Sequence, residues 1–515
     1  MNLLTDPLLP VELAGSETPL DLPSLLAALA REEVTGLPFL RAHQQAPFHA
    51  FCVQLAALAL HHRAGQGDIP GEPEVWRDLL RRLTPQWPDD EPWRLVVADP
   101  AKPAFMQAPV PEGTADPHTR VVETPDDLDV VVTSRNHGVK QALAADAPPA
   151  AWIAALVTVQ TTAGFMGAGN YGIARMNGGF ATRPFIGLVP PGGAGAHWRR
   201  DVAVLLRCRD WCLERAPDLA RDGGHGLLWL LPWDGSASVA LQKLDPWFIE
   251  VCRRVRLRLD ATGGLVARAT TSKAARLAAK ERCGNVGDPW IPIEIGRGSV
   301  AYNTTPHYAA MSAVLFRRDV WTRPLLLDWH ERIDGPAMTA RFDVLVRGQG
   351  TTEGHHRREM PIEGKKRLGM LMLPAERDRL AQLAGEMIGH ARDLRLRVLK
   401  FPLLTLAQAG AEEISLRDRT TTAWVEPWLT RVDQAVEPVF FGHLFQRAEQ
   451  GEAATQAWIA FLRELAATIF NDAVAAMPVA GARRMKAVAV AELRLRAALK
   501  KVFGGYLEVE TADAG

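Results

Sequence analysis

Glycine and polar side chains alternate in the run GAGNYGIARMNGGFATRP, which spans residues 167–184. Its first six residues match G-x-G-x-x-G, in which glycines let the backbone approach the pyrophosphate of a dinucleotide. That fingerprint needs a strand before it, a helix opening within it, and an acidic residue about 20 positions later. Here residues 151–166 have the composition of a buried helix, and two further glycines and Pro184 interrupt the residues after the match. The context therefore argues against a dinucleotide site.

The same segment has residue types that suit contact with a nucleic acid. Glycine lets a ligand approach the backbone closely, and polar or aromatic side chains supply donors and a stacking face. The side chains in question are Asn170, Tyr171, Arg175, Asn177 and Arg183. A tight connection between a helix and a strand would equally explain the glycines, so the residues alone leave both interpretations open.

A second polar stretch, SRNHG (134–138), follows the β-branched run LDVVVTS (128–134), which predicts a strand. Loops at strand ends often carry function. Ser134 and His137 are types used in nucleophilic catalysis, but closeness in sequence says little about geometry. A solvated turn and a nucleic-acid contact loop are the alternatives.

A third polar stretch, RGQGTTEGHHRREMP (347–361), predicts an exposed loop able to enter a nucleic-acid groove. His355 and His356 are adjacent, so on a helix or strand their side chains point apart and do not easily share one metal. The H-E-x-x-H spacing of zinc hydrolases is also missing. We therefore expect no metal site there.

The charge of the chain is balanced overall but uneven along its length. The 515 residues include 59 Lys and Arg and 59 Asp and Glu. Residues 252–282 nevertheless contain nine basic and two acidic residues, a net charge of +7. Local basic surface on a neutral chain suits a subunit that meets nucleic acid through one face.

The five cysteines are scattered, which suits free thiols in a reducing cytosol. Cys208 and Cys212 are one helical turn apart with no second pair at metal-ligand spacing, so we expect buried thiols and no zinc. No long apolar run free of charge or proline predicts a membrane span, and the first residues do not resemble a signal peptide. We expect a cytoplasmic protein without a cofactor.

The hydrophobic pattern predicts an α+β protein: a large mixed α/β domain over 1–364, then a four-helix bundle over 365–515. Apolar positions with helical spacing predict the four helices at 374–399 and at about 427–448, 453–477 and 482–503. In the first domain we predict short strands at 181–190, 227–233 and 290–296, and a hairpin over 257–271 closed by Gly263 and Gly264.

Six segments, taken in order, resemble the large subunit (CasA family) of type I-E CRISPR Cascade. They are MNLLTDPLLPV (1–11), KPAFMQ (102–107), TSRNHGVKQ (133–141), MNGGFATRPF (176–185), GDPWIPIE (287–294) and RGQGTTEGHHRRE (347–359). The resemblance covers nearly the whole chain. It implies a non-catalytic subunit of a crRNA-guided surveillance complex that recognises the protospacer-adjacent motif (PAM) on double-stranded DNA. Such a subunit promotes duplex opening and R-loop formation and recruits a helicase-nuclease for antiviral defence.

The resemblance also implies partners and site residues. The partners are target DNA, crRNA, the backbone, small and crRNA-handle subunits of Cascade, and the helicase-nuclease; no membrane is among them. The PAM-facing glycine loop falls on Gly169, Asn170, Tyr171 and Gly172, and a basic PAM contact on Lys280, with Lys273 as a rival. The wedge that splits the first base pairs falls on Gln349, flanked by Gly348 and Gly350. The loop over the crRNA handle and DNA entry falls on Arg135, Asn136 and His137. Zinc-type cysteine pairs found in some members are missing, so no metal is implied.

An enzyme is the alternative from another functional class. A nucleotide-dependent oxidoreductase would use the loop Gly167–Gly172, and a nuclease would use His137, His355 or His356. No acid pair, triad or phosphate-activating motif supports either activity.

Overall fold

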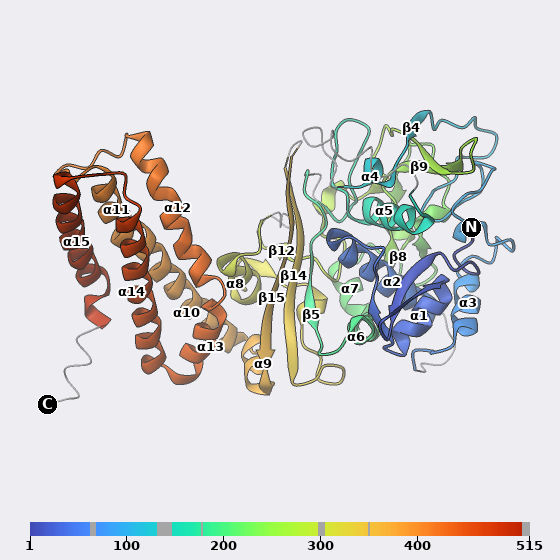
Figure 1. Cartoon of the computed structure of the whole chain (residues 1–515). Helices are drawn as coiled ribbons and strands as arrows, with labels where there is room; N and C mark the ends of the chain where they lie inside the picture. Colours follow the sequence, from blue (N-terminus) through green and yellow to red (C-terminus); the bar gives the residue numbers. More distant parts are fainter. Residues whose placement is uncertain (62–67, 131–146, 177–178, 297–303, 349–350, 507–515) are drawn as a thin grey trace. The chain divides into compact units, whose positions relative to one another are not determined.

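The computed structural model describes residues 1–506, except for 62–67, 131–146, 177–178, 297–303 and 349–350 (Figure 1). The chain divides into two compact units. The N-terminal unit comprises Met1–Pro306 and Arg318–Leu368, and the helical unit comprises His307–Arg317 and Gly369–Gly515. The first unit mixes helices with small sheets and the second is helical, so the predicted α+β class is confirmed. In the part of the chain that the structure describes, no helix is long and apolar enough to cross a bilayer.

Buried apolar helices form the centre of the N-terminal unit. Helix α5 buries almost every side chain along its length, as expected for the predicted helix at 151–166, and it ends four residues earlier. Helix α2 is buried over most of its surface and packs against α5, α6 and strand β8. The helices of this unit are α1 (Leu22–Ala30), α2 (Ala42–His61), α3 (Pro73–Arg82), α4 (Pro125–Leu128), α5 (Pro149–Thr162), α6 (Ala194–Arg207) and α7 (Arg209–Arg215), with α9 (Gly364–Met372) at the division.

The N-terminal unit also contains several small sheets, most of them antiparallel. The three-stranded sheets have the orders β2-β1-β3, β4-β10-β9 and β15-β14-β5, and the pairs are β11-β7, β12-β13 and β6-β8. The strands are β1 (Leu9–Leu13), β2 (Ser16–Leu20), β3 (Val34–Gly36), β4 (Arg120–Val122), β5 (Phe185–Val189), β6 (His225–Leu227), β7 (Val239–Ala240), β8 (Leu244–Ile249), β9 (Arg254–Leu259), β10 (Leu265–Thr270), β11 (Leu277–Ala278), β12 (Ile293–Glu294), β13 (Trp321–Thr322), β14 (Ala337–Gly348) and β15 (Thr351–Glu363). The predicted hairpin over 257–271 is confirmed, because Leu259 pairs with Leu265.

The predicted polar loop over 347–361 is wrong, because most of these residues form strand β15. They pair with β14 in the long hairpin of Figure 1, from Ala337 opposite Glu363 to Gly348 opposite Thr351. A strand is normally recognised in sequence by alternating apolar and polar residues. Residues 351–359 of β15 are all polar, charged or glycine, so this alternation is missing there. The three predicted short strands are all shorter than expected. Only Phe185–Val189 of 181–190 and Ile293–Glu294 of 290–296 are strands, and of 227–233 only Leu227 belongs to one, because residues 228–230 form a 3-10 turn.

The helical unit has the predicted helical spacing but different breaks. Its elements are α8 (Tyr308–Phe316), α10 (Pro374–Asp393), a π-helical turn (Leu394–Leu399), α11 (Lys400–Ala407), α12 (Arg419–Val436), α13 (Phe440–Gln450), α14 (Glu452–Ala475) and α15 (Ala482–Phe503). The single helix predicted at 427–448 is two helices, since Pro438 cannot continue the hydrogen-bond ladder. Helix α12 also begins earlier, where the Asp418 carboxylate accepts from the N–H groups of Thr420 and Thr421.

Helix α8 belongs to the helical unit although it precedes residue 365, where the sequence placed the start of the second domain. The ring of Tyr308 lies 4.8 Å from that of Phe440, and its hydroxyl donates to Asp433 at 3.1 Å. An apolar nine-residue helix gives no sequence signal about which unit it will join.

Candidate nucleic-acid interface

The glycine loop, residues 167–172, follows α5 and is closed by backbone hydrogen bonds. Asn170 donates its N–H to the carbonyl of Gly167 at 3.0 Å, and Met166 donates to the carbonyl of Asn170 at 3.0 Å. After the loop, Ile173 donates its N–H to the carbonyl of Ala163 at 2.9 Å. A helix precedes the loop and, among the described residues up to Pro184, none opens within it, so the geometry of a dinucleotide fingerprint is missing.

Two glycines of the loop are required by packing inside the protein. Gly169 has φ +77°, and a Cβ there would lie 2.6 Å from the Cβ of Thr271. A Cβ on Gly172 would lie 2.6 Å from the carbonyl carbon of Gly164. At Gly167, with φ +101°, a Cβ would meet open space. The open side of the loop therefore lies at Gly167 and the exposed Ala168, and Asn170 and Tyr171 are half-buried.

The segment after strand β10 packs against the glycine loop. Ser272 donates its N–H to the carbonyl of Gly169 at 2.9 Å, and the Tyr171 hydroxyl donates to the carbonyl of Lys273 at 3.2 Å. Lys273 in turn donates its N–H to the carbonyl of Gly235 at 2.7 Å, while its side chain is exposed. Lys273 thus lies beside the loop, with its backbone held by hydrogen bonds and its ammonium group exposed. Lys280 is also exposed, in a 3-10 turn over Lys280–Arg282.

Arg253 also anchors the loop, and sequence reasoning gave it no role of its own. Its guanidinium donates to the carbonyl of Tyr171 and, at 2.8 Å, to the carbonyl of Gly164. These two bonds join Tyr171 of the loop, and Gly164 just before the loop, to the residue that precedes strand β9. Arginine can bind several carbonyls at once, but sequence alone does not show which arginine will do so.

Arg175 and Arg183, expected as donors to a nucleic acid, face the interior instead. Arg175 Nε lies 2.6 Å and Arg183 Nη2 2.7 Å from the same oxygen of Asp288, and Arg175 Nη1 lies 3.3 Å from Glu250. All four side chains are at most 2% exposed. Glu250 also accepts a hydrogen bond from the N–H of Ala174 at 2.7 Å. Burial raises the pKa of Glu250 to about 7, although the positive charge of Arg175 lowers it. This network therefore fixes the chain just after the loop, at Ala174 and Arg175.

The expected basic surface over 252–282 is also partly internal. Arg256 and Arg276 are each 2% exposed and donate to backbone carbonyls, Arg256 to Lys102 at 3.0 Å and Arg276 to Leu231 at 2.8 Å. Burial lowers the pKa of both guanidinium groups to about 10. The exposed cations of this stretch are Arg268, Lys273 and Lys280. A count of charges along the sequence overstated the basic surface, because arginine often satisfies buried carbonyls.

Several predicted site residues lie outside the described residues: Arg135, Asn136, His137, Gln349 and Gly350. Gly348 is described. It ends strand β14 and pairs with Thr351 at the start of β15. The predicted wedge residue, Gln349, is thus the next residue in the sequence after a twelve-residue strand.

The histidines of β15 do not form a catalytic pair. His355 and His356 are consecutive in a strand, so their side chains point to opposite faces. His355 Nε2 lies 2.5 Å from Asp343, whose other oxygen accepts from Arg357 at 2.8 Å. The cysteines are free, and Cys52, Cys212 and Cys252 are buried as expected, whereas Cys208 and Cys283 are partly exposed.

Comparison with known proteins identifies solved structures that have this fold. No family model matches the chain, and no curated protein matches its sequence. Solved structures do match it: CasA from Thermus thermophilus is 18% identical, with a TM-score of 0.62 over 97% of this chain and 99% of that chain. Cse1 from Acidimicrobium ferrooxidans, a CRISPR-associated protein, is 15% identical, with a TM-score of 0.63 over 98% and 99%. Thermobifida fusca Cse1 is 17% identical, with a TM-score of 0.64 over 98% of both chains. The chain has, over nearly its whole length, the fold of the CasA (Cse1) structures.

Proposed function

We propose that this chain is a member of the CasA family and the large subunit of a crRNA-guided Cascade complex. In this role it recognises the PAM on double-stranded DNA, promotes duplex opening and R-loop formation, and recruits the helicase-nuclease. It works in the cytoplasm and has no catalytic activity of its own. The observation that carries the proposal is the match to CasA and Cse1 structures over 97–98% of this chain. The order of the six sequence motifs supports it independently.

The glycine loop and Lys273 are the proposed PAM contact. The open side at Gly167 and Ala168 leaves room for a groove edge, with Asn170 and Tyr171 beside it. Minor-groove readout needs few side chains because its donor and acceptor pattern is degenerate. The exposed ammonium groups of Lys273 and Lys280 supply the phosphate attraction, which is independent of sequence.

Gln349 is the proposed wedge, flanked by Gly348 and Gly350. The ladder between β14 and β15 runs from Ala337 opposite Glu363 to Gly348 opposite Thr351, with one shift of register between Val346 and Arg347. A long two-stranded hairpin of this kind would support a wedge residue that separates stacked bases. Inserting a side chain between base steps costs a few kcal/mol per step, so wedge and PAM contacts must act together. Arg135, Asn136 and His137 are the proposed contact to the crRNA handle and the entering DNA.

The remaining proposed partners follow from the place of such a subunit in Cascade. They are the backbone, small and crRNA-handle subunits, and the helicase-nuclease that docks once the R-loop has formed. Sequence recognition beyond the PAM belongs to the guide RNA.

The test compares Gln349→Ala with Gln434→Ala in the assembled complex. Gln434 is an exposed glutamine of helix α12 and serves as the matched control. On a PAM-bearing duplex labelled with a fluorescent base beside the PAM, Gln349→Ala should slow opening at least tenfold. Binding to a target melted in advance at the same positions should stay within twofold.

Two outcomes would count against this function. Equal losses on duplex and melted targets would remove the wedge role, leaving Gln349 as a general binding residue. Cleavage of DNA by the purified chain with a divalent cation, or oxidation of NADH, would favour the enzyme alternative instead.

A further inference from the structure

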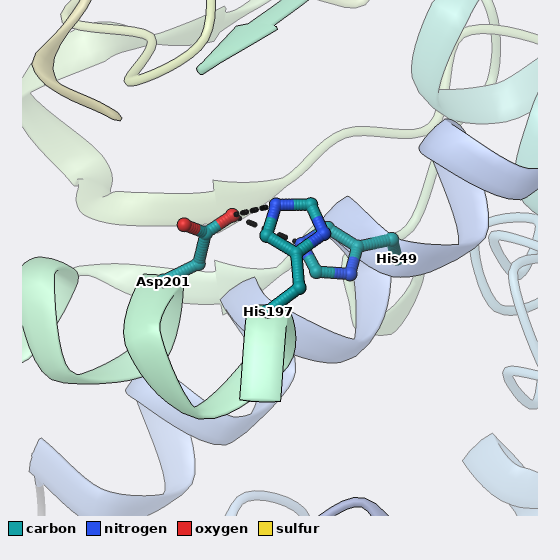
Figure 2. Close-up of side chains that lie close together, drawn as sticks. All are labelled: His49, His197 and Asp201. Atoms are coloured by element: carbon teal, nitrogen blue, oxygen red, sulfur yellow. Dashed lines mark hydrogen bonds and ion pairs between the residues drawn. The ribbon is translucent and has the colours of Figure 1, made fainter. Parts of the chain in front are cut away.

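Three side chains outside the proposed interface converge in the N-terminal unit: His49 from α2, and His197 and Asp201 from α6. His49 Nε2 lies 2.9 Å and His197 Nε2 3.3 Å from the same oxygen of Asp201. Figure 2 shows the imidazole ring of His197 in front of that of His49, with dashed lines to the oxygen of Asp201. The rings stack, with centroids 4.0 Å apart and planes 14° apart. We propose that His49, His197 and Asp201 form a binding site for one divalent transition-metal ion, with Zn²⁺ as the best match.

The ligand types and separations fit this ion. Zinc binds imidazole nitrogen and carboxylate oxygen at about 2.0–2.2 Å, so tetrahedral ligand atoms lie about 3.3 Å apart. The two separations of 2.9 and 3.3 Å are close to that edge length, and the ligand atoms of the three residues all lie within 4.8 Å of one another. His197 and Asp201 are one helical turn apart on α6 and face the same way. Two histidines and one carboxylate are a ligand set used for zinc and for Fe²⁺.

A second layer of contacts fixes the carboxylate. The other oxygen of Asp201 accepts from Arg200 Nη1 at 3.1 Å. Arg200 is itself held by Asp334, at 2.9 and 3.1 Å, and donates to the carbonyls of Leu326 and Asp328, both at 2.8 Å. Outer partners that orient a ligating carboxylate are typical of metal sites. Arg200 therefore leaves one oxygen of Asp201 directed at the two imidazoles.

The site borders a cavity that leaves coordination positions accessible. His49 and His197 line a cavity of about 390 Å³, together with Trp198, Trp290 and Arg341. Asp201 is 1% exposed, whereas the two histidine side chains are 18% and 16% exposed, toward this space. Three protein ligands with an open fourth position are the arrangement of zinc sites that bind water or a small ligand.

Metal binding here would replace a hydrogen-bonded arrangement. Without an ion, each Nε2–H donates to Asp201, which joins α2 to α6. With an ion, each neutral imidazole offers the Nε2 lone pair, so its proton moves to Nδ1 and no net proton need leave the ring. This lone pair lies in the ring plane, and the two planes are only 14° apart with centroids 4.0 Å apart, so ion binding also requires at least one imidazole to rotate out of the stack. The cluster can therefore exist in both states, and a direct binding measurement separates a metal site from a purely structural contact.

The test uses the untagged full-length chain, stripped with a chelator and dialysed against Zn²⁺. We expect one equivalent of zinc, measured by elemental analysis and calorimetry, and a rise in the thermal midpoint. His49→Gln and His197→Gln should each weaken binding at least ~10-fold, the lower end of what changes near a metal cost. His225→Gln, at an exposed histidine of β6, is the matched control and should bind like the unmodified chain.

A spectroscopic measurement on the unmodified chain keeps the proposal testable if a variant folds poorly. Co²⁺ in place of Zn²⁺ should give visible bands without a thiolate-to-metal charge-transfer band, because no cysteine is among the ligands. No zinc above the dialysis background, an unchanged affinity in both histidine variants, or a thiolate band abolished by Cys208→Ser would each overturn the site.

Discussion

Ser272 donates its backbone N–H to the carbonyl oxygen of Gly169 at 2.9 Å, joining segments 103 residues apart. The hydroxyl of Tyr171 makes a parallel contact to the carbonyl of Lys273 at 3.2 Å. The glycine loop is thus held by the segment after β10. The lack of a side chain at Gly169 allows the two backbones to come this close. If DNA binds this loop as proposed, it meets a shape that is already set, which lowers the conformational entropy lost on binding.

Gly169→Ala should therefore damage the loop more than Gly167→Ala. The new Cβ at 169 would meet Thr271 at 2.6 Å with φ at +77°, whereas the Cβ at 167 would have only its positive φ of +101° to overcome. We expect Gly169→Ala to lower the free energy of unfolding by about 1–3 kcal/mol and to abolish PAM-dependent binding of the assembled complex. Denaturant unfolding and binding to duplexes with and without the PAM measure both effects. Equal effects of the two substitutions would contradict the packing role of Gly169.

Lys273 is the stronger candidate for the phosphate contact, because its backbone is joined to the glycine loop. Lys273→Ala should weaken binding similarly on all duplex sequences and reduce the slope of log affinity against log salt by about 1. Lys280→Ala tests the rival position, and Lys243→Ala, at another exposed lysine in a 3-10 turn, is the control. A salt slope unchanged by Lys273→Ala but reduced by Lys280→Ala would reverse the assignment.

Elements whose own residue types determine their structure could be predicted from the sequence. Helix α5 is apolar on nearly every face, and the hairpin β9–β10 turns at Gly263 and Gly264, so local residue types decide both. The spacing of apolar residues likewise predicts the long helices of the second unit. The sequence motifs also predicted a fold that overall sequence identity of 15–18% does not reveal.

Features that depend on distant partners could not be predicted. Strand β15 is recognisable only through its pairing with β14, and Arg175 and Arg183 are internal only because Asp288 and Glu250 meet them. The convergence of His49 with His197 likewise depends on the packing of α2 on α6. Burial and pairing are properties of the folded chain. An estimate of the basic surface from charges counted along the sequence therefore includes arginines that are in fact buried.

The buried Glu250 predicts a specific pH dependence of stability. Its pKa rises from the ordinary 4.5 to about 7 because it is buried, so between these values the folded state keeps a proton that the unfolded state releases. The free energy of unfolding therefore falls as pH rises through this range, by about 3 kcal/mol in total. Glu250→Gln should lack this fall when denaturant unfolding is measured between pH 5 and pH 8.

The exposed Glu214 supplies the matched control for that experiment. Glu214→Gln should keep the pH dependence of the unmodified chain. Parallel curves for Glu250→Gln and the unmodified chain would mean that Glu250 stays ionised in the fold, held so by Arg175.

Tyr308 tests whether α8 is an integral part of the helical unit. Its ring packs on Phe440 at 4.8 Å and is 6% exposed, so Tyr308→Ala should cost about 3–5 kcal/mol of stability. Tyr308→Phe loses only the hydrogen bond to Asp433, worth about 0.5–1.5 kcal/mol. Phe401→Ala, at a 43% exposed ring of α11, is the control and should change stability little.

Hydrogen exchange of α12 and α13 measures this effect within the unit. If α8 is integral, Tyr308→Ala accelerates exchange in both helices, because they lose the partner that covers Phe440 and Asp433. Exchange no faster than in Phe401→Ala would mean that α12 and α13 are stable without α8. The cooperatively stable part of the unit would then begin after residue 368, and α8 would contribute little to its stability.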